Sequence, residues 1–168
     1  MGPFMEFVSK CAANELFVKL CPMSESMRDR YEDEELVVRF FAYSDRYSSF
    51  RHDVEKFLNK YVLDIEKNFD EETMSNEFNN MLIFVNKFFP HGFSKKKESK
   101  TTPRVRFEAI GVGVNLALRE NPDLTTTDVK SWIYSSEFEE ETTTHASNSL
   151  PLLRSRVEYV RDKVLGNS

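Results

Sequence analysis

Long stretches of this 168-residue chain carry apolar side chains at spacings of three and four residues, which is the period of one face of an α-helix. Several of these stretches stop at proline, as at Pro22, Pro90 and Pro122. The chain holds 15 Phe but only five Gly and six Pro, so residues that favour turns are scarce. The pattern predicts an all-α fold, a single-domain helical bundle of about six or seven helices.

The expected helices are bounded by acidic first turns, capping residues and stops. They cover residues 3–20, a segment that starts at Asp33, residues 49–67, 70–89 and 104–121, a short helix begun by Thr126 or Thr127, and residues 150–165 with Gly166 as the stop. The predicted core comprises Leu36, Phe40, Phe57, Tyr61, Leu82, Val85, Ile110 and Trp132.

Arg39 is a cation inside an otherwise apolar run. Glu35 lies one turn earlier, in the order that favours an ion pair along a helix. The long aliphatic stem of arginine can also cover apolar surface while its head reaches a carboxylate. The sequence therefore allows a structural role for Arg39.

The formal net charge of −5 argues against a protein that coats nucleic acid with its whole surface. Cys11 and Cys21 are the only cysteines, and their spacing fits neither a zinc site nor a disulfide framework. No apolar run approaches the roughly 20 residues needed to span a bilayer, and no secretory leader is visible. We expect a cytoplasmic protein with no membrane contact and reduced thiols.

The search for chemistry predicts no catalytic, cofactor-binding or metal-binding residue. The GVGVN stretch at 111–115 lacks the third glycine and the preceding strand of a dinucleotide loop, so its small residues favour close helix packing instead. His52, His91 and His145 lie in three separate segments without metal-ligand spacing, and we expect them on the surface.

The strongest local charge signal is a basic loop over residues 91–103, continued into the next helix. If it contacts anions, phosphate groups of nucleic acid are the natural partners. A solvated connector is the alternative explanation. The candidate contact residues are Lys95, Lys96, Lys97, Lys100, Arg104 and Arg106.

One stretch resembles a known family. The sequence RDRYEDEELVVRFFAYSDRY, followed by FLNKYV, is similar to the helical part of bacterial DGQQR-motif proteins, the ParB and sulfiredoxin-like family of GmrSD-type restriction systems. GPF near the N-terminus and NELFVKL at 14–20 resemble the segment that precedes it there. The resemblance is distinctive over about residues 14–62, whereas RVRFEAIGVGVNLAL and LLRSRVEYVRDKVL are compatible with later helices of the family but less specific.

Family members carry a nucleotide-binding domain with the DGQQR signature, and many add an HNH nuclease. This chain contains neither motif, so no catalytic residue carries over. The resemblance implies a non-catalytic helical domain of a phage-defence protein that relays between a nucleotide-binding module and an effector, or supports an oligomer. Because the first helix begins at Pro3 without a lead-in, we expect a part of a longer protein. An autonomous nucleic-acid-binding module, with weak DNA contact through residues 95–106, is the alternative.

Overall fold

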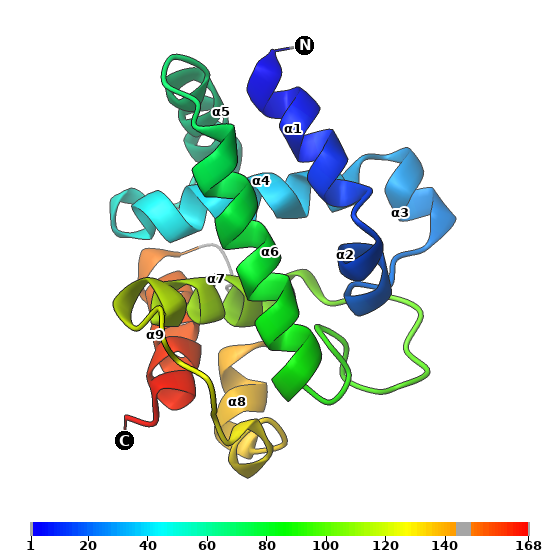
Figure 1. Cartoon of the computed structure of the whole chain (residues 1–168), viewed down its shortest axis with the longest axis vertical. Coiled ribbons are helices and arrows are strands. Elements are labelled where there is room, and N and C mark those ends of the chain that lie inside the picture. Colours follow the sequence, from blue (N-terminus) through cyan, green and yellow to red (C-terminus); the bar gives the residue numbers. More distant parts are fainter. Residues whose placement is uncertain (1, 144–148, 168) are drawn as a thin grey trace.

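The computed structural model describes residues 2–143 and 149–167, and every regular element in that part of the chain is helical (Figure 1). The all-α prediction is therefore confirmed. The elements are α1 (Pro3–Ala12), α2 (Glu15–Leu20), α3 (Glu25–Asp29), α4 (Glu32–Arg46), the 3₁₀ turn η1 (Tyr47–Ser49), α5 (Val54–Glu66), α6 (Glu71–Phe88), α7 (Arg104–Glu120), the 3₁₀ turn η2 (Val129–Ser131), α8 (Ser136–Glu141) and α9 (Leu150–Leu165).

Helix α7 is the centre of the bundle. Its residues 105–115 are all buried, and it packs against α4, α6 and α9. A helix that loses contact with water on every side must be covered by neighbours all round. In Figure 1, α6 crosses in front of α4 and α7, while α9 lies beside α7. Helix α1 packs against α4, α5 and α6.

The predicted core is confirmed at seven of its eight positions, which are all buried. The exception is Phe57, which is partly exposed because it packs on the outside of the core, with its ring stacked on that of Tyr43. Phe40 lies at the centre, and its ring meets the edge or face of the rings of Phe41 and Phe78. Aromatic side chains thus fill the space where α4 and α6 meet.

Gly113 confirms the interpretation of the small residues in α7. A methyl group added at its Cα would come within 2.5 Å of Cβ of Val160 and 2.9 Å of the carbonyl oxygen of Val157, both in α9. Real side chains do not approach so closely, so glycine is what allows α7 and α9 to lie in contact. Gly111 faces α4 instead, where Phe40 leaves ordinary van der Waals room.

The single helix expected over residues 3–20 is wrong, because the chain forms two helices there. Helix α1 ends at Ala12, and α2 starts at Glu15. The side chain of Asn14 accepts hydrogen bonds from the backbone amides of Leu16 and Phe17 and thereby caps α2. A strong N-terminal cap inside an apolar repeat restarts the helix in a new direction.

Two other boundaries also differ from expectation. Helix α5 begins at Val54 rather than at residue 49, because Asp53 caps it through the amide of Lys56. The short helix expected to begin at Thr126 or Thr127 is the 3₁₀ turn η2, which begins at Val129 and is not capped by a threonine. Instead, the hydroxyl of Thr127 donates to the carbonyl of Val164 in α9. The three apolar side chains that were expected to point inward here, Val129, Trp132 and Ile133, are buried as predicted.

The basic segment at 91–103 is a loop, as predicted, but both of its ends are anchored. The amide of Phe93 donates to the carbonyl of Leu20, and the ring of Phe93 packs on Phe107. At the other end, the hydroxyl of Thr102 donates to the carbonyl of Pro22. Only the stretch between these anchors, residues 95–101, is largely exposed.

Candidate functional site

Arg39 belongs to a buried charge cluster around Glu108, a carboxylate that is only 1% exposed. Arg39 of α4 donates to Glu108 across 2.9 Å, Arg104 of α7 across 2.6 Å, and Arg156 of α9 across 3.1 Å. Glu35 adds the expected ion pair along α4, with 3.6 Å between its Oε1 and Nη2 of Arg39. Arg39 has the structural role that the sequence allowed, but its main partner, Glu108, lies 69 residues away in the chain.

Burial and ionic attraction shift the pKa values of the arginines in this cluster in opposite directions. Desolvation alone would lower the pKa of Arg39, but the attractions of Glu108, Tyr43 and Glu35 together outweigh it, so that pKa is raised. For Arg156, desolvation outweighs the attraction of Glu108, so its pKa falls. A guanidinium nevertheless stays protonated at neutral pH. What the cluster does is tie α4, α7 and α9 together.

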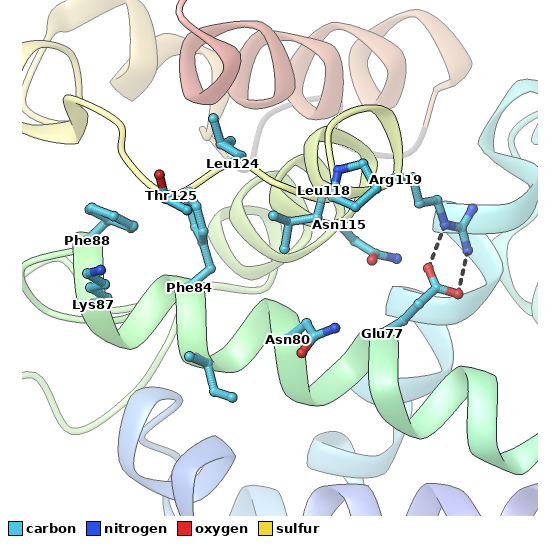
Figure 2. A pocket seen from close by; sticks show the side chains of 12 residues that line it. Glu77, Asn80, Phe84, Lys87, Phe88, Asn115, Leu118, Arg119, Leu124 and Thr125 are labelled. Carbon is cyan, nitrogen blue, oxygen red and sulfur yellow. Dashed lines mark hydrogen bonds and ion pairs between the residues drawn. The ribbon is translucent and has the colours of Figure 1, made fainter.

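A second arginine joins three helices at the surface. Arg119 of α7 pairs with Glu77 of α6 across 2.6 Å and with Asp45 of α4 across 2.6 Å. It also donates to the carbonyl of Ser44. Figure 2 shows the two bonds between Arg119 and Glu77 at one end of a hollow. These contacts are structural as well, since each charge already has a partner.

The structure divides the six predicted basic residues into two groups. Lys95, Lys96, Lys97 and Lys100 are exposed on the loop, and Lys95 reaches Glu139 of α8 across 3.2 Å. Arg104 and Arg106 point away from them. Arg104 joins the Glu108 cluster, and Arg106 is buried, where it donates to the carbonyl of Phe93 and lies over the ring of Phe138. An exposed basic surface thus comprises the lysines alone.

An apolar groove of about 1160 Å³ lies between three helices. We call it the α1–α4–α5 groove. Two large apolar side chains stand exposed in it, Tyr31 and Leu63, each with 67% of its surface accessible. Its lining residues are Met5 and Ser9 of α1; Tyr31, Glu34, Glu35, Val38 and Arg39 of or next to α4; and Val54, Glu55, Leu58, Asn59, Val62 and Leu63 of α5.

Sequence reasoning missed this groove. The groove is lined both by buried side chains of the core, such as Val38 and Leu58, and by exposed ones from three separate helices. Leu63 was the available signal, because it lies outside the stripe of apolar residues that α5 buries. Glu108 was missed in the same way, although it is an acid between Phe107 and Ala109 in an otherwise apolar helix.

A smaller hollow of about 440 Å³ lies between α6 and the segment that follows α7 (Figure 2). Phe84 and Phe88 line it from α6, Leu124 lines it from the segment after α7, and Arg119 and Glu77 lie at one end. We call it the α6–α7 hollow. Ile83 stands at its rim with 59% of its surface exposed. The hollow offers mixed polar and apolar contacts.

The predicted histidines and cysteines do not come together. His52 is exposed and His91 is partly buried, while His145 lies outside the described residues. Cys11 and Cys21 are buried and unpaired, and desolvation raises the pKa of each thiol to about 12. Among residues 2–143 and 149–167, no three His, Cys, Asp or Glu side chains are grouped so that they could hold a metal ion.

No helix in the described part of the chain has the length and apolar character to cross a membrane. Comparison with protein-family models, with curated proteins and with solved structures found no match.

Proposed function

We propose that this chain is a non-catalytic, cytoplasmic helical domain of a GmrSD-like bacterial phage-defence protein. It docks a nucleotide-binding module of the DGQQR type and relays the state of that module to an effector, or supports an oligomer. The observation that carries the proposal is the α1–α4–α5 groove, where Tyr31 and Leu63 leave large apolar surfaces in water. Exposed apolar surface that lines a hollow and is rimmed by polar groups marks interaction sites on proteins.

The distribution of charge agrees with a docking role. Three charged side chains of kinds that enzymes use are each engaged in ion pairs that join helices: Glu108, Arg39 and Arg119. Such contacts fix how α4, α6, α7 and α9 lie relative to one another. A rigid bundle that holds an apolar groove open is a suitable platform for a second module.

The proposal is tested by mixing this chain with a separately produced DGQQR-type nucleotide-binding module from the same genome. We expect a complex in isothermal titration calorimetry that Leu63→Glu abolishes. Leu63 is largely exposed, so this substitution leaves the fold intact. Ile83→Glu is the matched control, since Ile83 is an aliphatic residue of similar exposure in the α6–α7 hollow.

Two results would contradict the proposal. One is an equal affinity of the wild type and Leu63→Glu for the module, or no binding by either. The other is hydrolysis of a nucleoside triphosphate or of DNA by the isolated chain that a single substitution within it removes. We expect no such turnover, because the motifs that the resembled family uses for both reactions are missing from the sequence.

Nucleic-acid binding by the lysine loop is the second candidate function. Lys95, Lys96, Lys97 and Lys100 are exposed within six residues, on a chain whose net charge is −5. Anion contact would therefore concentrate at this loop. Such contact would be weak and insensitive to base sequence, because lysines bind phosphates rather than base edges.

A titration of labelled duplex DNA at low salt distinguishes this candidate from a solvated loop. The wild type is compared with a variant in which Lys95, Lys96 and Lys97 are all changed to Glu. Binding by the wild type that weakens steeply with salt and is lost in the variant supports a phosphate contact. Equal affinity of both proteins, or no binding by either, removes the loop from the functional description.

A further inference from the structure

We infer that the occupant of the α1–α4–α5 groove is a basic amphipathic helix of about three turns, contributed by the docked module. The inference rests on the proposed function for the existence of a docking partner, and it adds the chemical class of the segment that binds. It follows from the shape of the groove, from the charge around its rim and from the way Tyr31 is held.

The shape of the groove fits one helix. Val54, Leu58 and Val62 follow one another at intervals of four residues and form an apolar row along α5. Tyr31 and residues of α4, together with Met5 and Ser9 of α1, line the rest of the groove. The ten residues from Val54 to Leu63 rise about 14 Å, which matches two to three turns of a helix laid alongside.

The rim of the groove is acidic. Glu34, Glu35 and Glu55 line it, against one cation, Arg39. All three acids lie in first turns, where helix dipoles favour them. Three carboxylates against one guanidinium leave two negative charges, and the two helix N-termini, with about half a positive charge each, reduce this to a surplus of about one. A partner helix with lysine or arginine on its flanks complements that surplus.

Two of the rim acids have room for new partners. Glu35 has a side chain that is half exposed, with its pairing distance to Arg39 at the long end of an ion pair. Glu55 forms no ion pair with any cation in the described part of the chain. Glu34, in contrast, accepts a hydrogen bond from Ser9 and so holds α1 against α4. Glu35 and Glu55 are therefore the acids that a basic flank would contact.

Tyr31 is held at the mouth of the groove by an unusual backbone conformation. It has φ 58° and ψ 30°, the left-handed region that a bulky residue rarely adopts. The conformation places an aromatic ring in solvent where α3 turns into α4. An exposed aromatic side chain on a rigid backbone is a suitable anchor for a docked helix.

The test uses two fluorescent peptides with the same leucine face, each locked as a helix by a hydrocarbon staple on its outer side. One has lysines on both flanks and the other has glutamates. We expect the basic peptide to bind the full chain about tenfold more tightly at low salt, with the difference shrinking as salt rises. Leu63→Glu should abolish binding, and Ile83→Glu should leave it unchanged.

A charge reversal makes the test specific for the rim. In the double variant Glu35→Gln, Glu55→Lys, the preference for the basic peptide should disappear or reverse, while the melting temperature stays close to that of the wild type. Equal affinity of the two peptides for the wild-type chain would overturn the inference, as would binding that survives Leu63→Glu. Self-association that Leu63→Glu abolishes would also overturn it, since a second copy would then fill the groove.

Failure of this inference and failure of the proposed function give different results. If neither peptide binds but the nucleotide-binding module still requires Leu63, docking at the groove holds and the basic helix is wrong. If the basic peptide binds but the module ignores the groove, the groove accepts such helices and the proposed partner is wrong.

Discussion

The close contact between α7 and α9 leads to a prediction that depends on a single methyl group. In Gly113→Ala, the new Cβ would lie 2.5 Å from Cβ of Val160 and 2.9 Å from the carbonyl oxygen of Val157. The second contact is with backbone, which cannot rotate away. The two helices must therefore move apart, although α9 is also tied to α7 by the ion pair between Arg156 and Glu108.

The magnitude follows from two opposing effects. Overpacking of a well-filled core costs about 1–3 kcal/mol. Alanine is favoured over glycine inside a helix by about 1 kcal/mol, which offsets part of that cost. We expect Gly113→Ala to lower the free energy of unfolding by up to about 2 kcal/mol, or the melting temperature by up to about 6 °C for a chain of this size.

Gly111→Ala is the matched control, since it makes the same change in the same helix two residues earlier. Its Cβ would meet Phe107 and Phe40 at 3.6 Å, which is ordinary contact. The gain in helix propensity then has no packing cost to overcome. We expect a rise of up to about 1 kcal/mol in stability, or about 2–3 °C in melting temperature.

Thermal unfolding followed by circular dichroism at 222 nm measures both variants side by side. The reasoning requires opposite signs for the two substitutions. If Gly113→Ala were as stable as Gly111→Ala, the contact between α7 and α9 would not be as close as described. A loss of stability in both variants would mean that Gly111 also faces a tight neighbour.

Three further predictions concern the core, the charge cluster and pH. Phe40→Asp should unfold the chain, because an unpaired charge at this fully buried site costs several kcal/mol; a native helical spectrum and melting temperature would refute its burial. Glu108→Gln should cost about 3–5 kcal/mol in urea unfolding, because it removes the buried negative charge that Arg39, Arg104 and Arg156 share; a loss below about 1 kcal/mol would show that the cluster does not hold the helices. Burial raises the pKa of the Cys11 and Cys21 thiols from 9.0 to about 12, so the folded chain keeps these protons at a pH where the unfolded chain loses them. The free energy of unfolding should therefore be unaffected by these thiols below pH 9 and should fall as the pH rises from 9 to 12. Urea midpoints that stay level over that range would contradict this expectation.

The sequence predicted the fold class and most of the core because both depend on local periodicity. Leu82, Val85 and Ile110 repeat at helical spacing, and burial of that face is the simplest outcome. Boundaries were less certain because capping competes with periodicity. Asn14 ends one helix and starts another inside an apolar repeat, and nothing in the spacing of the apolar residues shows this.

The functional surfaces were harder to predict because they depend on contacts between distant segments. Arg106 looks like part of a basic patch in the sequence, yet in the fold it turns inward and lies over Phe138. Glu108 meets arginines from three helices, and the sequence places only Arg104 near it. The groove needs α1, α4 and α5 together, so no single segment carries its signature.

The most direct test of docking at the α1–α4–α5 groove is hydrogen–deuterium exchange, measured with and without the DGQQR-type module. The first three amides of a helix have no carbonyl partner within it, so those of α4 and α5 exchange faster than amides in the helix interior unless something covers them. We predict slower exchange over residues 31–35 and 54–58 when the module binds, with residues 95–101 unchanged. Protection confined to the lysine loop or to the α6–α7 hollow, or no protection at all, would contradict docking at the groove.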